Sequence, residues 1–186
     1  MKKQRRAVFL DRDGTLNIER DLVRTPEDLS LIDGASSALK ALQDEGYALI
    51  VVTNQSAIAR GTLSVNELNT VHDSLAERLA LAGVSLDDIL YCPHHPTEGT
   101  PPLRTVCECR KPAPGMLKNA ATTHDIDLTR SWMIGDNLSD IEAGERAGAR
   151  SLLVLTGKGQ RFADQLSSDR VVEDLSAAAK KIITED

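Results

Sequence analysis

Short apolar runs alternate along the chain with longer segments in which apolar residues recur every three or four positions. The runs predict buried strands, and the longer spacing predicts amphipathic helices. Strands are expected at residues 7–10, 48–52, 89–91, 132–134, 151–155 and 171–172, and helices at 35–45, 64–83, 114–124, 139–148 and 175–183. Because the strands have no polar face, this order predicts an α/β fold with a doubly wound parallel sheet covered on both sides.

Two capping-box patterns mark expected helix starts. Ser64-Val65-Asn66-Glu67 and Ser139-Asp140-Ile141-Glu142 each precede or open an apolar stripe, so Ser64 and Ser139 are the expected N-caps. The 186 residues contain neither an internal repeat nor a linker. A chain of this length suits one compact domain, residues 1–186.

Polar segments follow four of the predicted strands, at the point where each strand ends. The carboxyl ends of parallel strands meet at one edge of the sheet, where ligands bind in such folds. The segments are Asp11-Arg12-Asp13-Gly14-Thr15, Thr53-Asn54-Gln55-Ser56, Arg110-Lys111-Pro112 (beyond the third strand) and Gly135-Asp136-Asn137-Leu138-Ser139-Asp140. We expect a functional site where these segments converge.

The acidic residues of these segments suit a divalent cation. Asp11 and Asp13 stand one residue apart, and on an extended strand end their side chains point the same way. Two carboxylates that close repel each other unless a cation or a proton intervenes. Asp136 and Asp140 add further negative charge, and hard oxygen ligands of this kind suit Mg²⁺.

The remaining groups suit a phosphate. Thr53 offers a hydroxyl, Asn54 an amide, Lys111 a compact cation and Arg110 a planar fork. Phosphoryl transfer depends mainly on positioning and charge neutralisation, which such a set provides. Each motif alone also fits an ordinary polar loop or turn. Their occurrence in order, each after its own strand, predicts a phosphoryl-transfer site.

These motifs, in this order and spacing, resemble the four-motif signature of the haloacid dehalogenase superfamily over nearly the whole chain. The resemblance implies a Rossmann-like core in which Asp11 is a nucleophile that becomes an aspartyl phosphate. It implies that Asp13 is the general acid and later the base, so that its pKa is expected to be raised. Thr53 and Lys111 match the phosphate stabilisers.

The same resemblance implies a Mg²⁺ site. Asp11, the backbone carbonyl of Asp13, and Asp136 match the ligands, and Asp140 is expected to support the site from behind them. The segment 17–32 is too short for the cap domain of larger members, so we expect a capless enzyme. Substrate contacts are expected from Arg12, Glu19, Asn54, Gln55, Ser56, Arg110 and Asn137.

All three cysteines lie in one irregular segment, about residues 92–109. Cys92, His94, Cys107 and Cys109 form two ligand pairs that fit a closed, structural Zn²⁺ site. His95 is the rival to His94 as a ligand. Reduced cysteines without metal, or a disulfide that leaves one thiol free, are the alternatives. Because the segment ends directly before Arg110, zinc is expected to fix Arg110 and the lysine that follows it.

Cys92-Pro93-His94-His95-Pro96, the later Cys-Glu-Cys-Arg-Lys-Pro, and the run 53–61 resemble the bacterial heptose-1,7-bisphosphate 7-phosphatases. The resemblance implies hydrolysis of the 7-phosphate of a heptose bisphosphate, in the synthesis of lipopolysaccharide precursors. Histidinol-phosphate phosphatases share the zinc loop but usually have a shorter gap between its two halves. Histidinol-phosphate phosphatase activity is therefore the second hypothesis. A non-catalytic zinc-loop binding module is the third. Asp21-Leu22-Val23 departs from the family's Gly-Tyr-Val, and Asn137 stands where a basic residue is frequent.

The remaining expectations concern partners and location. A formal net charge of −6 favours neither nucleic acid nor an anionic membrane as a partner. The apolar run after the basic residues 1–6 is too short for a signal peptide, so the protein is expected in the cytoplasm with a solvated basic tail. A monomer is expected. His72 and His124 fall in helical segments and are expected to be structural.

Overall fold

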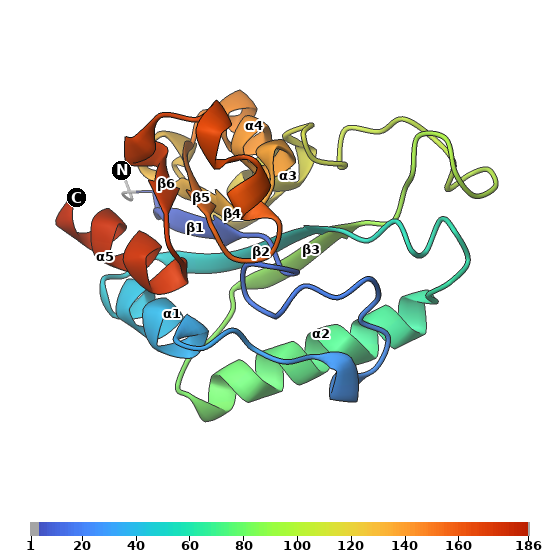
Figure 1. Ribbon diagram of the computed structural model, residues 1–186, viewed down its shortest axis with the longest axis horizontal. Helices are drawn as coiled ribbons and strands as arrows, with labels where there is room; N and C mark the ends of the chain where they lie inside the picture. Colours follow the sequence, from blue (N-terminus) through green and yellow to red (C-terminus); the bar gives the residue numbers. More distant parts are fainter. Residues whose placement is uncertain (1–3, 186) are drawn as a thin grey trace.

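The computed structural model describes residues 4–185 and contains a six-stranded sheet in which all paired strands are parallel (Figure 1). The strand order is β3-β2-β1-β4-β5-β6. The chain runs outward from β1 to β3 and then crosses back to build β4 to β6 on the other side. The predicted doubly wound sheet is therefore confirmed. The strands are β1 (Ala7–Leu10), β2 (Ala48–Asn54), β3 (Asp88–Cys92), β4 (Trp132–Gly135), β5 (Arg150–Val154) and β6 (Val171–Val172).

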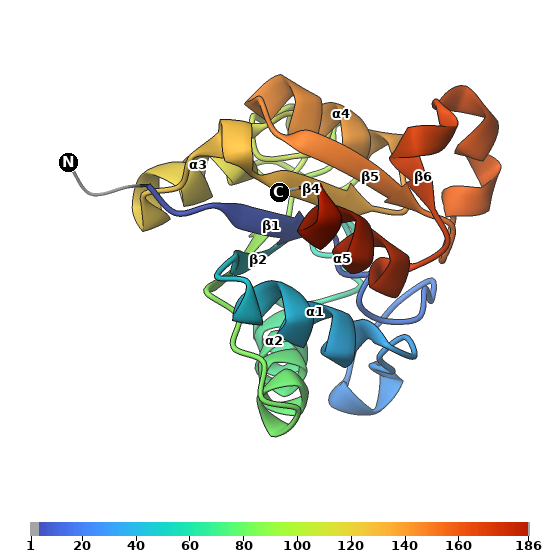
Figure 2. The same ribbon diagram turned by 90° about the vertical axis from the view of Figure 1, so that its left-hand side faces the viewer.

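Five α-helices of the described residues cover both faces of the sheet. The first, second and fifth pack on one face, and the third and fourth on the other (Figure 2). They are α1 (Ala35–Asp44), α2 (Val65–Leu81), α3 (Gly115–His124), α4 (Leu138–Ala147) and α5 (Leu175–Thr184). Single 3-10 turns occupy Pro26–Asp28, Leu128–Arg130, Gly159–Arg161, Ala163–Gln165 and Ser168–Arg170.

The core has two halves because each strand sends alternate side chains to opposite faces. Val8 and Leu10 of β1 face the cluster formed with α1, α2 and α5, whereas Phe9 faces the cluster formed with α3 and α4. The core is mostly aliphatic, and Trp132 is buried with it. This packing fixes the carboxyl end of β1, between β2 and β4.

The start of α4 differs from the prediction. Asn137, not Ser139, is the N-cap: its side chain accepts a hydrogen bond from the Ser139 N–H, and Asp140 accepts one from the Asn137 N–H at 3.0 Å. An asparagine in extended conformation directly before the helix caps as well as a serine does. The second of these hydrogen bonds ties the Asp140 carboxylate to the turn after β4.

The basic N-terminus is exposed but bonded where it is described. Residues 1–3 of the expected tail lie outside the described residues. Arg5 is exposed to solvent, as expected, and it is also held in place: its carbonyl accepts a hydrogen bond from the Asp127 N–H and its guanidinium pairs with Asp87 at 2.7 Å.

No cap domain is inserted among residues 4–185. Residues 17–32 form a short excursion with one 3-10 turn, as expected for a capless fold. The segment from Cys92 to Pro114 extends away from the body of the sheet as an irregular loop (Figure 1). None of the helices within this range is both long enough and apolar enough to cross a bilayer.

Candidate active site

A pocket of about 280 Å³ opens at the carboxyl ends of β1, β2 and β4. It lies at the point where the strand order reverses, which is where ligands bind in doubly wound folds. The pocket brings together all four predicted segments, and its lining is strongly polar. The lining residues include Asp11, Arg12, Asp13, Glu19, Arg20, Asp21, Thr53, Asn54, Gln55, Ser56, Arg60, Arg110, Lys111, Asp136, Asn137, Asp140 and Lys158.

Lys111 is a buried cation at the floor of this pocket. Its Nζ donates to Asp11 Oδ1 at 2.8 Å and to the Val52 carbonyl at 2.7 Å, and it pairs with Asp140 Oδ1 at 2.6 Å. Burial alone would lower the pKa of Lys111, but the charges of the two carboxylates outweigh it and raise the pKa. The ammonium therefore stays charged beside Asp11, as a phosphate stabiliser requires.

Asn54, the last residue of β2, fixes the backbone of Lys111. The Asn54 amide donates to the Lys111 carbonyl and accepts from its N–H, both at 3.0 Å. This amide, predicted to contact substrate, lines the pocket and is bonded in both directions to the lysine backbone. Thr53 lies beside it at the end of β2 with almost no exposure.

Asp136 is held by a segment that the sequence analysis overlooked. The N–H of Lys158, in the loop after β5, donates to Asp136 Oδ2 at 2.7 Å. A side chain at Gly14 (φ +84°) or Gly157 (φ +56°) would place its first carbon 2.2 Å or 2.1 Å from the same oxygen. The two glycines thus allow two loops to close on one carboxylate. The rule that polar residues follow strand ends, applied to the fifth strand, would have found Lys158.

Three carboxylates form a group that could hold a cation. Ligand oxygens of Asp11, Asp136 and Asp140 lie within 4.8 Å of one another. With Lys111 they carry three negative charges against one positive charge, so two negative charges remain, which is the charge that one Mg²⁺ offsets. Burial, followed by the charge of Asp11, raises the pKa of Asp136 to about 7. Burial also raises the pKa of Asp140 to about 6, although Lys111 opposes the shift.

The raised pKa of Asp136 predicts a pH-dependent stability for protein freed of divalent cations. Between its ordinary value of 3.8 and about 7, the folded chain keeps a proton that the unfolded chain releases. This stabilising contribution is complete below the ordinary value and is lost as the pH rises through about 7. We expect the free energy of unfolding in EDTA to fall between about pH 5 and pH 8, by on the order of 2 kcal/mol.

Added Mg²⁺ should raise the melting temperature more at the higher pH, where it no longer displaces a proton. The variant Asp136→Asn is the control and should remove the part of this dependence that lies above about pH 6, since Asp140, whose pKa is raised to about 6, contributes in the same sense below that pH. Asp13, whose pKa is lowered, acts in the opposite sense, but below its ordinary value of 3.8 and outside this interval. Equal melting temperatures in EDTA at both pH values would contradict the assignment.

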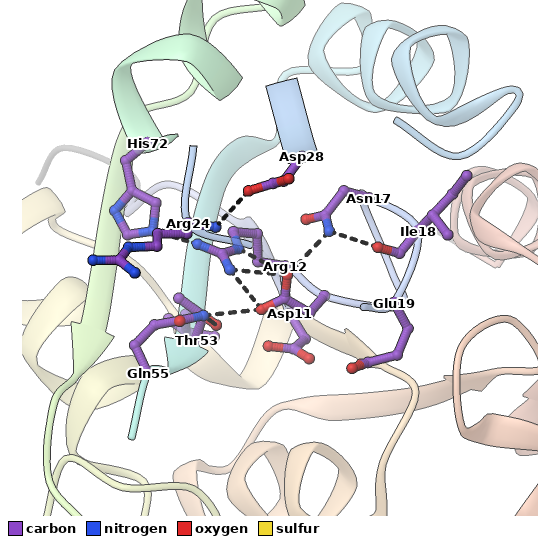
Figure 3. Close-up of polar contacts among 12 residues, drawn as sticks. Asp11, Arg12, Asn17, Ile18, Glu19, Arg24, Asp28, Thr53, Gln55 and His72 are labelled. Carbon is purple, nitrogen blue, oxygen red and sulfur yellow. Dashed lines mark hydrogen bonds and ion pairs between the residues drawn. The ribbon is translucent and has the colours of Figure 1, made fainter. Parts of the chain in front are cut away.

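Three side chains, from Arg12, Asn17 and Gln55, donate hydrogen bonds to the Asp13 carboxylate. Figure 3 labels these three donors. Arg12 NH2 donates to both of its carboxylate oxygens, at 2.9 and 2.7 Å, and Arg12 Nε donates to Oδ1 at 3.1 Å. Asn17 donates to Oδ1 at 3.0 Å, and Gln55 donates to Oδ2 at 2.9 Å. Asn17 was not predicted, although it lies in the same strand-end loop. Arg12 and Gln55, predicted as substrate contacts, line the pocket and also donate to Asp13.

The predicted raised pKa of Asp13 is wrong for the ligand-free site. Burial acts to raise it, but the charge and hydrogen bonds of Arg12, with hydrogen bonds from Asn17 and Gln55, lower the pKa overall. An acid catalyst needs a raised pKa, but here the adjacent guanidinium of Arg12 outweighs the effect of burial. Asp13 is therefore a carboxylate in the resting site.

The other predicted contacts lie at the pocket rim. Glu19 pairs with Lys158 at 3.2 Å, and burial raises the pKa of Glu19. Arg110 donates to the His94 carbonyl at 3.1 Å, so its guanidinium is tied to the irregular loop. Asn137 lines the pocket beside its own helix cap. Ser56 lines the opposite wall, and Arg20 and Arg60 add two cations that the sequence analysis did not name.

The irregular loop brings four metal-ligand atoms within 4.8 Å of one another. The Sγ atoms of Cys92, Cys107 and Cys109 are 3.1 to 3.5 Å apart, and His94 Nδ1 lies 3.6 Å from Cys92 and 3.3 Å from Cys109. Ligand atoms around one Zn²⁺, with Zn–S bonds of about 2.3 Å, are separated by roughly 3.5–3.8 Å. A disulfide would need about 2 Å. The cysteines are free, so the predicted cluster forms and the disulfide alternative is excluded.

The structure also separates the two candidate histidines. His95 is outside the cluster, and its Nδ1 accepts hydrogen bonds from the N–H groups of Thr97 and Glu98 instead. Burial raises the pKa of Cys92, so without a cation that sulfur keeps its proton. The four ligand atoms therefore fit a metal that stabilises thiolates, and the geometry supports His94 as the histidine ligand.

Comparisons with known proteins agree with this site. The family model for HAD-hydrolase-like proteins matches residues 108–178. The D-glycero-beta-D-manno-heptose-1,7-bisphosphate 7-phosphatase of Salmonella typhi is 42% identical over 185 residues, which cover 97% of this chain and 98% of the relative. The enzyme of the same name from Haemophilus ducreyi is 44% identical over 92% of this chain and 94% of the relative.

Solved structures give the same result. The D,D-heptose 1,7-bisphosphate phosphatase of B. bronchiseptica, complexed with magnesium and phosphate, superposes with a TM-score of 0.86 at 36% identity, over 97% of this chain and 99% of that one. The corresponding enzyme of Burkholderia thailandensis gives 0.73 at 30% identity, with the same coverage. The chain therefore belongs to the haloacid dehalogenase superfamily and, within it, to the family of heptose-1,7-bisphosphate 7-phosphatases.

Proposed function

We propose that this protein removes the 7-phosphate of D-glycero-β-D-manno-heptose 1,7-bisphosphate by way of a phosphorylated Asp11. The observation that carries the proposal is the placement of Asp11. Its carboxylate is bonded to the buried Lys111, grouped with Asp136, and shares one pocket with Asp13. The choice of the sugar is based on the names of the relatives, and the type of reaction is based on the residues of the site. The product would enter the synthesis of lipopolysaccharide precursors.

In the first step, a carboxylate oxygen of Asp11 attacks phosphorus and the bond to the sugar oxygen breaks. Asp13 gives its proton to that oxygen, so the sugar leaves as an alcohol. Asp13 is a carboxylate in the resting site, and the negative charge of a bound phosphate raises its pKa so that it takes up the proton. Lys111 and the Thr53 hydroxyl stabilise the charge on the transferring group.

In the second step, Asp13 takes a proton from water as that water attacks phosphorus. The bond from phosphorus to Asp11 breaks, which releases inorganic phosphate, restores the Asp11 carboxylate and leaves Asp13 protonated, as it was before the first step. Splitting hydrolysis into two transfers lowers the barrier of each. The lowered pKa of Asp13 favours its carboxylate form. The order of steps therefore uses the same side chain first as an acid and then as a base.

Asp11, Asp136 and the carbonyl of Asp13 are the proposed ligands of Mg²⁺. Asp140 uses both of its oxygens, one on Lys111 and one on the Asn137 N–H, which supports a role behind the ligands. When bound, Mg²⁺ offsets the excess negative charge and polarises the phosphoryl oxygens. At the rim, Arg110, Glu19, Ser56 and Asn137 are the proposed sugar or second-phosphate contacts.

The wider assignment is also a proposal. Residues 1–186 would act as one phosphatase domain, with Zn²⁺ bound by Cys92, His94, Cys107 and Cys109. Free thiols beside one another suit the reducing cytoplasm. We propose a cytoplasmic monomer that binds neither nucleic acid nor membrane, in keeping with the acidic net charge.

The substrate assignment predicts a preference that steady-state kinetics can measure. With Mg²⁺ present, kcat/KM for heptose 1,7-bisphosphate should exceed that for histidinol phosphate by about 10- to 100-fold. A second phosphate near Arg110 gains a charge-assisted contact of about 1.5–3 kcal/mol that histidinol phosphate cannot make. Comparable values for the two substrates would contradict the sugar assignment, and no hydrolysis of any phosphate ester would support the binding-module hypothesis. The comparisons do not favour the histidinol enzyme, since the relatives reported above carry the heptose name.

A further inference from the structure

The guanidinium of Arg12 makes contacts on two sides. On one side it grips Asp13, and on the other its NH1 lies 3.2 Å from Nε2 of His72, in α2 (Figure 3). His72 is 60 residues from Arg12 in the chain and contributes no atom to the pocket lining. Arg12 is 1% exposed and His72 is 6% exposed, so water cannot replace either contact.

The chemistry of the pair fixes its hydrogen-bond direction. A guanidinium only donates, so His72 must accept through Nε2 and carry its proton on Nδ1. Burial and the adjacent Arg12 lower the pKa of His72 to about 4, in agreement with a neutral ring. The ring is also held by packing, because it meets Tyr91 of β3 at a centroid distance of 5.9 Å. Its neighbours Leu68, Val71 and Leu75 in α2 are buried as well.

We propose that His72 is a positioning residue, which holds the plane of the Arg12 guanidinium so that Arg12 presents Asp13 to the reacting phosphate. A guanidinium bonded to a single carboxylate can still rotate with it, whereas one anchored at its far nitrogen cannot. His72 is therefore the anchor that α2 provides for the acid–base residue. This inference rests on the proposed function, because it assigns Asp13 the proton transfers of that reaction.

The test compares His72→Leu, which removes the acceptor, with His72→Gln, whose amide oxygen can accept the same bond. We expect the Leu variant to lower kcat by about 10-fold with KM changed less than about twofold, since misplaced acid–base groups affect chemistry more than binding. The Gln variant should keep at least about half of the wild-type kcat. The control His124→Leu, in α3 and paired with Asp88 outside the pocket, should leave kcat unchanged.

A leaving-group comparison separates positioning from a merely structural role. Rapid acid quench gives the rate of the first step for the sugar bisphosphate and for p-nitrophenyl phosphate, whose leaving group needs no proton. His72→Leu should slow the first reaction at least about fivefold more than the second. A structural defect would slow both equally, and that result would overturn the inference.

A double-mutant cycle keeps the test decisive if one variant folds poorly. Arg12→Lys retains the positive charge beside Asp13 but cannot bridge to His72. If His72 acts through Arg12, adding His72→Leu to Arg12→Lys should change kcat no further, whereas a second loss of about 10-fold on top of that of Arg12→Lys would overturn the inference. Wild-type protein that fails to hydrolyse the sugar bisphosphate would instead overturn the proposed function. Wild-type activity with an unaffected His72→Leu overturns the inference alone.

Discussion

The variant Asp11→Asn should lose turnover by at least about 10⁴-fold, because an amide oxygen is a far weaker nucleophile than a carboxylate. The side chain keeps its size, so Lys111 and Asp136 should stay in place. Lys111 also keeps its bonds to Asp140 and the Val52 carbonyl. Phosphate release from the heptose bisphosphate, measured with saturating Mg²⁺, gives the loss directly.

Two measurements make this result specific to the nucleophile. Acid-quenched wild-type enzyme, incubated with substrate, should carry a phosphoryl group that mass spectrometry places on the peptide containing Asp11, and the variant should carry none. Asp33→Asn is the matched control, since it makes the same chemical change at an exposed aspartate outside the pocket. Residual turnover of Asp11→Asn above about 1% of wild type, without deamidation back to aspartate, would assign the attack to water instead.

The convergence of the four polar segments in one pocket could be predicted from the sequence, because periodicity and strand ends are local properties. Asp11, Thr53 and Asp136 lie at or just beyond a strand end, and a parallel sheet brings those ends together. Lys111 follows β3 only after the long irregular loop, and Asn54 at the end of β2 holds it in place. Lys158 obeys the same rule and was overlooked only because its loop carries no acidic motif. The zinc cluster was predictable for a similar reason, since its ligands are concentrated in one short segment.

The contacts that the sequence did not predict depend on the orientation of buried side chains. The sequence shows that Arg12 is next to Asp13, but it does not show that the Arg12 guanidinium turns back onto the Asp13 carboxylate. This contact reverses the expected shift in the pKa of Asp13. His72 carried a partial signal, because it lies one turn beyond Leu68 on the buried stripe of α2. A polar residue in such a stripe needs a buried partner, and only the fold shows that the partner is Arg12.

Loss of zinc should produce the second large effect, on stability and on substrate affinity together. The variant His94→Ala or Cys107→Ser should bind less than one equivalent of zinc and melt at least about 10 °C lower, since structural zinc sites contribute several kcal/mol to folding. His95→Ala is the matched control and should keep its zinc, because His95 lies outside the ligand cluster. Elemental analysis and thermal melting provide both readouts.

The kinetic consequence should fall on KM, because the structure anchors the two cations after the loop differently. Arg110 is tied to the His94 carbonyl and moves with the zinc loop, whereas Lys111 is held by Asn54, Asp11 and Asp140 within the sheet edge. Zinc loss should therefore raise KM for the bisphosphate at least about 10-fold while kcat falls less than about threefold. A zinc-free variant whose kcat collapses with KM unchanged would show that the loop positions Lys111 after all, as the sequence alone had suggested for both cations.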